Sequence, residues 1–378
     1  MVIIFYGTSA ELIKMVGVIQ RIPRSELLLI CSSQHHNGLK KVHKQLNIYP
    51  DVTLSSGWFG KDVMTIQQMA GMMIHAHANF LRRLIPLRHQ IRQHDKQHNT
   101  KSIAVVHGDT LTTVVGCYMG RALGLRVAHV EAGLRTHNWR SPFPEEIDRR
   151  IAAKFARLHF PPSDLAESDL RKEKIKGEII NTQYNTSKDT IEQSSKFLSD
   201  DFKKLKLPRT YCLVLLHRTE LIENKDDLEA ILKVIYNHAS ATTPVVFTEH
   251  STTWEKIRSF GFEHYLKKDG MTVIHKQPYF DFMEIVRRSD YIVTDGGGLQ
   301  EDAFFLGIPA IIHRKVTERQ DGLGFNAELS ELNTKKVESF LNNHKNKNDL
   351  RRSIESISPS QIVVDTFLQQ EYFTTSVK

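Results

Sequence analysis

Short apolar runs rich in Val, Ile and Leu alternate with longer stretches of helical periodicity along most of this chain. Continuous apolar runs of this kind are typical of strands that are buried on both faces of a parallel sheet. The alternation therefore predicts an α/β fold with doubly wound, Rossmann-like sheets. The runs predicted as strands are Val2–Tyr6, Leu27–Cys31, Ile103–His107, Arg126–Val130, Cys212–Leu216, Val245–Thr248, Met271–Ile274, Tyr291–Thr294 and Ala310–His313. The segments predicted as helices are Ala10–Arg21, Thr65–Gln93, Thr112–Ala122, Glu145–Leu158, Lys225–His238, Thr253–Phe260, Tyr279–Arg288 and Leu299–Leu306.

A polar segment over residues 188–208 interrupts this alternation. It separates a first βα series from a second one that begins at Tyr211. A chain of 378 residues has room for two domains of ordinary size. We therefore predict a domain boundary near this segment.

The charge balance bears on the kind of partner. The chain carries 51 Lys and Arg against 43 Asp and Glu, a net charge of +8. The basic residues are spread along amphipathic stretches, and neither a zinc-finger nor an RNA-binding signature occurs. We therefore expect an anionic small substrate and no nucleic-acid partner.

Neither export nor membrane insertion is predicted. The apolar start Val2–Tyr6 lacks a basic n-region, and no run approaches the roughly 18 apolar residues of a membrane span. Cys31, Cys117 and Cys212 are odd in number, lie in apolar surroundings and lack metal-ligand spacing, which predicts reduced core thiols. We expect a soluble cytoplasmic protein that binds no metal.

Ionisable side chains directly follow several predicted strands. Asp109 comes after the run that ends at His107, Glu131 after the run that ends at Val130, and His217 after a strand of the second series. Ligands bind at the carboxyl ends of the strands in open α/β sheets. Imidazole titrates near neutrality, so His217 could exchange a proton or hydrogen-bond a departing phosphate. These positions are predicted to carry the chemistry.

A glycine-rich turn, Asp295-Gly296-Gly297-Gly298, links a predicted strand to the helix at residues 299–306. Three glycines allow close backbone approach, and the N–H groups at a helix start favour anions, which indicates a diphosphate site. A tight turn that binds nothing is the alternative. The carboxylate of Asp302 could accept ribose hydroxyls, although acids are favoured in a first helical turn in any case.

Lys14 and Glu145 also have purely local interpretations. Lys14 either neutralises a phosphate near the first loop or is an ordinary surface lysine. Thr8 and Glu11, in that loop, have the spacing of a capping box. Glu145 and Glu146 begin a predicted helix in which each would pair with an arginine four residues further on.

Eight ordered motifs resemble those of the UDP-N-acetylglucosamine 2-epimerase family over about residues 3–325. They are Gly7-Thr8-x-x-Glu11-x-x-Lys14-Met15, His107-Gly108-Asp109-Thr110, His129-Val130-Glu131-Ala132-Gly133-Leu134-Arg135, Ser141-Pro142-Phe143-Pro144-Glu145-Glu146, Asn185-Thr186, Leu216-His217-Arg218, Thr294-Asp295-Gly296-Gly297-Gly298-Leu299-Gln300-Glu301 and Thr317-Glu318-Arg319. The resemblance implies a homodimer of GT-B-like, two-domain chains with the nucleotide sugar in a cleft between the domains. The N-terminal sugar-side domain would span residues 1–185, completed by a C-terminal helix at 361–378, and the UDP-binding domain residues 186–360.

The resemblance also implies a reaction. Family members eliminate UDP from UDP-GlcNAc to give 2-acetamidoglucal and then add UDP back, which yields UDP-ManNAc without any cofactor. Asp109, Glu131 and Glu145 are implied as catalytic acid/base groups at the sugar, and His217 as a catalytic group at the diphosphate. The residues implied in substrate binding are Lys14, Arg135, Arg218, Gly296, Gly297, Gly298, Asp302 and Arg319.

The chain departs from the family pattern mainly at the nucleotide end. Ser9 stands where an arginine is usual, Gly296 where a serine is usual and Asp302 where a glutamate is usual. Lys14 or Arg218 would have to supply the charge of the missing arginine.

Two questions stay open at this level. Gln34, Asn37 and His250 resemble parts of a second UDP-GlcNAc site that activates some bacterial members, which gives a hypothesis of allosteric activation. The same motifs also suit a hydrolysing epimerase that releases ManNAc and UDP, a GT-B glycosyltransferase, or a sugar-nucleotide-binding regulator without turnover.

Overall fold

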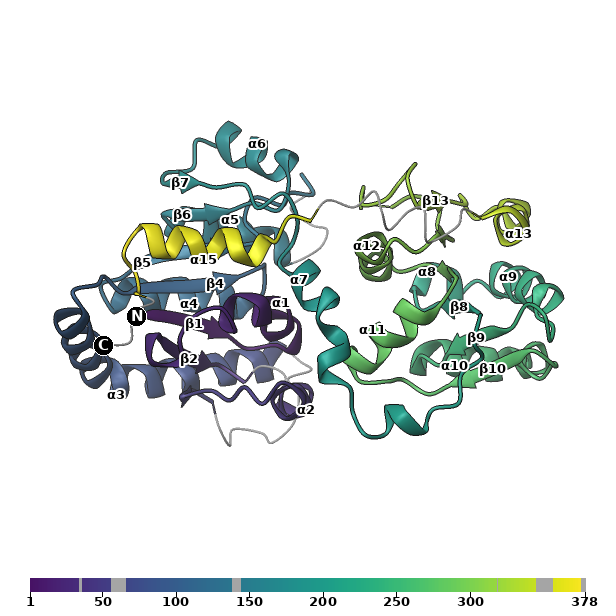
Figure 1. Ribbon diagram of the computed structural model, residues 1–378, viewed down its shortest axis with the longest axis horizontal. Helices are drawn as coiled ribbons and strands as arrows, with labels where there is room; N and C mark the ends of the chain where they lie inside the picture. Colours follow the sequence, from purple (N-terminus) through teal and green to yellow (C-terminus); the bar gives the residue numbers. More distant parts are fainter. Residues whose placement is uncertain (34–35, 56–65, 138–143, 318, 345–355, 375–378) are drawn as a thin grey trace. The chain divides into compact units, whose positions relative to one another are not determined.

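The computed structural model describes residues 1–33, 36–55, 66–137, 144–317, 319–344 and 356–374. The chain divides into two units: Met1–Thr190 together with Ile357–Lys378, called unit 1, and Ile191–Ser356, called unit 2. The two divisions, after Thr190 and after Ser356, lie close to the domain boundaries expected from the sequence, at 185/186 and 360/361. Each unit is built around its own parallel sheet (Figure 1).

The described part of unit 1 contains a seven-stranded sheet with the order β3-β2-β1-β4-β5-β6-β7. Its strands are β1 (Val2–Tyr6), β2 (Leu27–Cys31), β3 (Val52–Thr53), β4 (Ile103–His107), β5 (Arg126–Val130), β6 (Leu158–Phe160) and β7 (Glu178–Ile179). Its helices are α1 (Ser9–Ile19), the 3-10 turn η1 (Arg24–Glu26), α2 (His36–Leu46), α3 (Ile66–His98), α4 (Leu111–Ala122), α5 (Glu145–Phe155), α6 (Asp164–Lys172) and α15 (Pro359–Gln369). Helix α7 (Ser187–Glu192) crosses from unit 1 into unit 2.

The described part of unit 2 contains a six-stranded sheet with the order β10-β9-β8-β11-β12-β13. Its strands are β8 (Cys212–Leu215), β9 (Val245–Thr248), β10 (Met271–Ile274), β11 (Tyr291–Thr294), β12 (Ala310–Ile312) and β13 (Ala327–Leu329). Its helices and turns are η2 (Ser194–Phe197), η3 (Phe202–Lys204), α8 (Thr219–Ile222), α9 (Lys225–His238), α10 (Ser251–Phe260), η4 (Glu263–Leu266), α11 (Tyr279–Arg288), α12 (Gly297–Leu306) and α13 (Thr334–Asn343).

The strand order reverses beside the first strand of each sheet. In unit 1 strand β1 pairs in parallel with both β2 and β4, and in unit 2 strand β8 pairs in parallel with both β9 and β11. Every residue of β1, β4 and β11 is buried, because helices cover both faces of a doubly wound sheet. Ligands bind at such a reversal, beyond the carboxyl ends of the strands. The loops after β1, β4, β8 and β11 are therefore where each unit is expected to bind.

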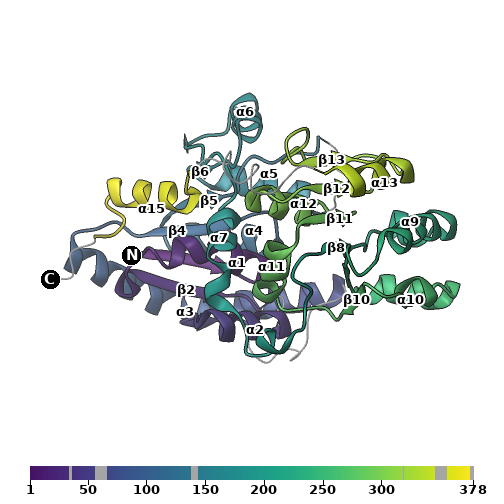
Figure 2. The ribbon, with the colours of Figure 1, turned by 45° about the vertical axis from the view of Figure 1, so that its right-hand side comes forward.

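Helix α15 returns to unit 1 and packs against α1 (yellow in Figures 1 and 2). The buried carboxylate of Asp189 accepts the backbone N–H of Ser360, at the start of α15, at 2.7 Å. The ring of Phe367 meets that of Phe160 edge to face, with centroids 5.7 Å apart. Unit 1 is thus completed by residues far along the chain from its other elements.

Some predicted bounds differ from the structure. The helix predicted over Glu145–Leu158 is too long, since Ala156 takes extended backbone (ψ 160°) and Leu158 begins β6. Helix α15 spans Pro359–Gln369, where a helix was expected over 361–378. Strands β3, β6, β7 and β13 were not predicted, because two or three residues are too few to show a period.

The three cysteines are buried and form no disulfide, as predicted. Burial raises the pKa of the Cys31 thiol to about 11 and that of Cys117 to about 12, and also raises the pKa of Cys212. Within the described ranges, no helix combines the length and the apolar character needed to cross a membrane.

Candidate active site

The loop after β1 is held by the buried carboxylate of Glu11, which is 2% exposed. Its Oε2 accepts the backbone N–H groups of Gly7 and Thr8, both at 2.8 Å, while the Thr8 hydroxyl accepts the N–H of Glu11. This is the capping box that the sequence spacing predicted. The other oxygen, Oε1, accepts the hydroxyl of Thr110 at 2.5 Å, so Glu11 also ties the loop after β1 to the loop after β4.

Glu131 follows β5 directly and takes a left-handed backbone, with φ at 63°. Its Oε2 lies 2.6 Å from the ammonium nitrogen of Lys14 and 3.1 Å from Nε2 of His107. Burial by itself would raise the pKa of Glu131, but Lys14 and His107 outweigh it and hold that pKa well below its usual range. Glu131 is therefore a carboxylate at neutral pH, and Lys14 neutralises it rather than a phosphate in this structure.

Asp109 lies in the loop after β4, next to Gly108 with its φ of 69°. Its Oδ2 accepts from Arg149 of α5, from Nη2 at 2.6 Å and from Nε at 2.9 Å. His129 fixes this loop by donating from Nε2 to the carbonyl of Gly108 at 2.7 Å. Burial lowers the pKa of His129 to about 3, so its ring is a neutral, structural donor. The loop thus presents a carboxyl group that is held by Arg149.

The first turn of α5 adds two more acids beside Asp109. Asp148 is 6% exposed, and its Oδ2 has no hydrogen-bond partner among the described residues; the same holds for Oε2 of Glu145. Burial, and after it the charges of Asp109 and Glu145, raise the pKa of Asp148 to about 7. This cluster can hold and release a proton near neutral pH.

The helix-surface pairs considered for α5 form only in part. Glu146 does pair with Arg150, at 3.0 Å, as the spacing predicts. Arg149 turns instead to Asp109 and to Glu146, so the alternative pairing of Glu145 with Arg149 is not what the structure shows.

In unit 2 a fully buried carboxylate, Asp295, connects the ends of β8 and β11. Its Oδ2 accepts the backbone N–H of His217 at 2.9 Å and that of Arg218 at 2.8 Å. Its Oδ1 lies 3.2 Å from Nδ1 of the His217 ring. Asp295 therefore fixes the backbone at His217 through hydrogen bonds and places a carboxylate beside the His217 ring at the strand-order reversal.

The glycine turn begins α12 without any side-chain cap. Gly296 is the N-cap residue, and a Cβ there would lie 2.6 Å from Cε1 of His217. A Cβ on Gly298 would meet no atom within 4 Å. The backbone N–H groups at the start of α12 can thus receive an anion beside His217, which suits the diphosphate site expected from the sequence.

The loop after β12 packs over the start of α12. Gln300 donates from Nε2 to the carbonyl of Asp321 at 2.9 Å and accepts the hydroxyl of Thr317 at 3.0 Å. Arg319 lies 3.0 Å from the carboxylate of Glu301. Asp302, on the same helix, lies near Tyr279: burial, then Asp302 and Glu301, raise the pKa of the Tyr279 phenol well above its usual value.

Other predicted residues have different surroundings. Arg135 has a fully enclosed side chain that binds both oxygens of Glu173, at 3.0 and 2.8 Å, and the carbonyl of Leu134. This geometry favours a structural role for Arg135 over the predicted substrate contact. Arg218 is the N-cap residue of α8.

The residues of the allosteric hypothesis are only partly described. Gln34 lies outside the described residues, and for Asn37 the structure describes only a backbone within α2. The ring of His250 lies 5.4 Å from that of His217, between centroids, and its Nδ1 lies 2.9 Å from the hydroxyl of Thr252. Burial and then His217 lower the pKa of His250. His250 thus adjoins the group expected to act on the diphosphate.

Four supporting residues were not predicted as site residues: His107, Asp148, Arg149 and Asp295. His107 and Asp295 stand inside the motifs at strand ends, so their position was a usable signal. Asp148 and Arg149 lie on a helix, where the pattern of acids and bases indicated only surface pairs.

Comparison with known proteins shows which family this chain resembles. The sequence profile described as UDP-N-acetylglucosamine 2-epimerase matches residues 18–361. A Bacillus subtilis protein named UDP-N-acetylglucosamine 2-epimerase is 30% identical over 327 residues, covering 84% of this chain and 80% of the relative. The Methanocaldococcus jannaschii UDP-GlcNAc 2-epimerase structure has a TM-score of 0.74 and 26% identity, covering 97% of this chain and 98% of that one. A structure of the M. jannaschii enzyme in complex with UDP-GlcNAc and UDP has a TM-score of 0.66 and 25% identity, covering 97% and 98%.

Proposed function

The chain belongs to the UDP-N-acetylglucosamine 2-epimerase family, and from that premise we propose that it interconverts UDP-GlcNAc and UDP-ManNAc by the non-hydrolysing route. UDP is eliminated to give 2-acetamidoglucal and then adds back after the proton has returned to the opposite face of C2. The observation that carries this proposal is the set of groups that follow the strands. In unit 1 these groups are acidic side chains, and in unit 2 they are a histidine and the start of a helix.

The groups of unit 2 suit the leaving UDP. Negative charge grows on the diphosphate as the C1–O bond breaks, and N–H donors aimed at that charge lower the barrier. The start of α12 offers such donors at Gly297 and Gly298, while the N–H of Gly296, the first glycine of the turn, donates to the Thr294 hydroxyl at 3.1 Å. His217, oriented by Asp295, would hydrogen-bond the departing phosphate through Nε2.

The groups of unit 1 suit the sugar. Positive charge develops at C1 as the bond breaks, and the ionised Glu131 can stabilise it. The C2 proton must move to a base and then return on the other face. We assign this transfer to Asp109 and Glu145, with Asp148 holding a proton beside them near neutral pH.

The remaining substrate contacts are also proposals. Arg218, Arg319 and Asp302 lie in the loops and helix around the glycine turn and suit the nucleotide. Activation by a second UDP-GlcNAc, through Gln34, Asn37 and His250, stays a prediction. So do the homodimer and the cytoplasmic location.

One incubation separates the candidate functions. The protein is mixed with UDP-GlcNAc in D2O, and the products are followed by proton NMR, with a protein-free sample as the control. UDP-ManNAc carrying deuterium at C2 is the expected product. Free ManNAc with UDP would show the hydrolysing reaction instead, transfer to an added acceptor would show a glycosyltransferase, and binding without turnover would show a regulator.

A further inference from the structure

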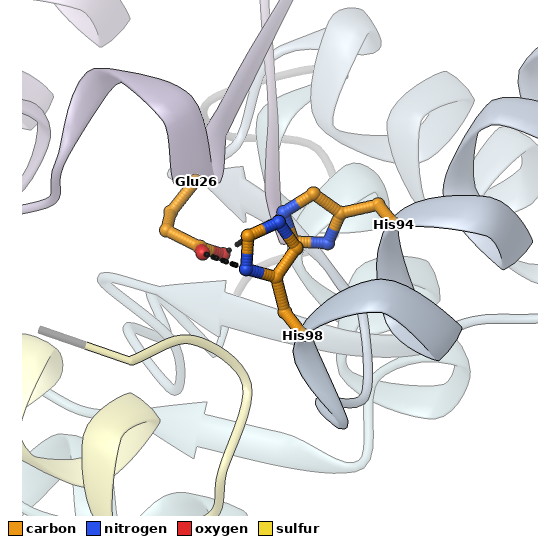
Figure 3. Close-up of side chains that lie close together, drawn as sticks. All are labelled: Glu26, His94 and His98. Carbon is orange, nitrogen blue, oxygen red and sulfur yellow. Dashed lines mark ion pairs between the residues drawn. The ribbon is translucent and has the colours of Figure 1, made fainter. Parts of the chain in front are cut away.

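Three side chains that the proposed reaction does not use converge near the amino ends of the parallel strands of unit 1. The proposed catalytic groups lie at the carboxyl ends. The three side chains are Glu26 of η1 and His94 and His98 of α3 (Figure 3). We propose that they bind one divalent transition-metal cation, with zinc as the best fit. The sequence predicted no metal site, because nineteen histidines hid this pair and the carboxylate lies far away along the chain.

The geometry approaches that of a zinc site. Oε2 of Glu26 lies 3.2 Å from Nε2 of His94, and Oε1 lies 3.7 Å from Nδ1 of His98. Ligands about 2.0–2.1 Å from a tetrahedral zinc ion are about 3.4 Å from one another. All three ligand atoms lie within 4.8 Å of one another, so a small rotation of the side chains would close the site.

The helix presents the two imidazoles together. His94 and His98 are four residues apart, so they project from one face of α3, and their rings stack with centroids 4.4 Å apart. Figure 3 shows the carboxylate of Glu26 pointing toward both rings. Two histidines and a glutamate are a common protein ligand set for zinc, and they leave a fourth position for water.

The buried ligands are also short of partners. Glu26 is 3% exposed, and its Oε2 has no hydrogen bond within the described part of the protein. Neither ring nitrogen of the largely buried His94 has a hydrogen bond there either. Buried polar atoms without partners are costly, and a cation would satisfy them.

One positive group competes for the same carboxylate. The amino group of Met1 lies 3.7 Å from Oε2 of Glu26 and 4.0 Å from Asp95, and it donates to the carbonyl of Tyr372 at 2.7 Å. His98 is 34% exposed at its side chain, so a cation could reach the site from solvent.

The site is distinct from the proposed catalytic groups. The amino group of Met1 lies beside Glu26, and Met1 directly precedes the first residue of β1. Glu131 and Asp109 instead follow the last residues of β5 and β4. Because the strands are parallel, these two sets lie at opposite edges of the sheet. Metal binding can therefore be tested independently of turnover.

The test titrates tag-free protein, freed of metal with EDTA and dialysed, with zinc chloride by isothermal calorimetry. We expect one site per chain with a dissociation constant in the micromolar range or tighter. His98→Ala should weaken binding at least about 10-fold, since it removes one of three ligands. His98 ends α3 and is partly exposed, so this variant is expected to fold, which its thermal unfolding checks.

His89→Ala is the matched control, because His89 is an exposed histidine on the same helix. It should bind zinc as the unaltered protein does. Cobalt(II) gives a second readout: the visible absorption of a low-coordinate site should appear in the unaltered protein and be lost in His98→Ala. Absence of zinc binding, or equal affinities of the two variants, would overturn the proposal.

Discussion

At the residue scale, Glu131 is a carboxylate whose charge is enforced by its neighbours. Lys14 and His107 contact the same oxygen, and the backbone is left-handed at this position. The function of such a group depends on its charge more than on its size. Replacement by the isosteric amide therefore tests its role directly.

We expect Glu131→Gln, and separately Asp109→Asn, to lower kcat by at least about 100-fold, because each removes a charge proposed to act on the sugar. Initial rates of UDP-ManNAc formation measure this. Glu167→Gln is the control, since the partners of Glu167 within the described part of the chain all lie on or near α6. Unchanged activity in both active-site variants would refute the assignment.

Asp148 gives a prediction about pH. Its pKa is about 7 in the folded protein against 3.8 for an ordinary aspartate, so the folded state keeps a proton that the unfolded chain loses. The stability from this proton is complete below about pH 4 and is lost as pH rises through about 7. Ionised Asp148 then remains buried near Asp109 and Glu145.

The free energy of unfolding of Asp148→Asn should therefore be close to that of the unaltered protein near pH 5. Near pH 8.5 the variant should be more stable, by an amount on the order of 2 kcal/mol. Thermal and denaturant unfolding at the two pH values measure the difference. A stability difference that does not grow with pH would show that Asp148 titrates normally.

Asp295 is predicted to act through His217. Asp295→Asn keeps the size of the side chain but weakens the backbone hydrogen bonds that position His217, so kcat should fall about 10-fold, with a smaller change in KM. In a His217→Ala background the same substitution should have little further effect. Additive effects of the two substitutions would mean that Asp295 has a separate function.

At the element scale, the attachment of α15 depends on Asp189. This buried carboxylate accepts the Ser360 backbone N–H and the Ser358 hydroxyl, and lies 3.6 Å from Arg21. A Cβ on Gly17 of α1 would lie 2.4 Å from the Ser360 hydroxyl, so the two helices approach closely. Loss of this carboxylate leaves buried donors without partners.

Asp189→Ala should therefore destabilise unit 1 by about 2 kcal/mol and speed hydrogen exchange across α15. Asp365→Ala is the control, because Asp365 is exposed on the same helix and its only described partner is Gln361. Its effect should stay within about 0.5 kcal/mol. Equal exchange rates for α15 in both variants would contradict the role of Asp189.

The elements also show what the sequence could predict. Strands such as β1, β4 and β11 are continuous buried apolar runs, so their positions could be predicted to the residue. Strands β6 and β7 could not, because two or three residues are too few to show a pattern. The strand-end rule located Asp109, Glu131 and His217, but not Asp148, whose raised pKa depends on burial that no local pattern shows.

At the scale of the whole molecule, the three buried thiols report on both units. Cys31 and Cys117 lie in unit 1 and Cys212 lies in unit 2. Burial raises all three pKa values, so few thiolates are available for reaction in the folded protein. Reactivity towards a thiol reagent should therefore follow unfolding.

We expect negligible reaction with Ellman's reagent in the native state and three thiols per chain in denaturant. If the units unfold separately, the thiols should appear in steps of two and one, and mass spectrometry of the labelled peptides would identify the unit. Rapid native labelling of any of the three would contradict the described burial.

The discontinuity of unit 1 has a consequence for its biosynthesis. A nascent chain leaves the ribosome in order, so all of Ile191–Ser356 emerges before α15 does. Until then the face of α1 that receives α15 is exposed, even after the seven strands have been synthesised. The last step in completing the first-made unit must therefore await the synthesis of α15, and until then that unit is an incomplete folding intermediate.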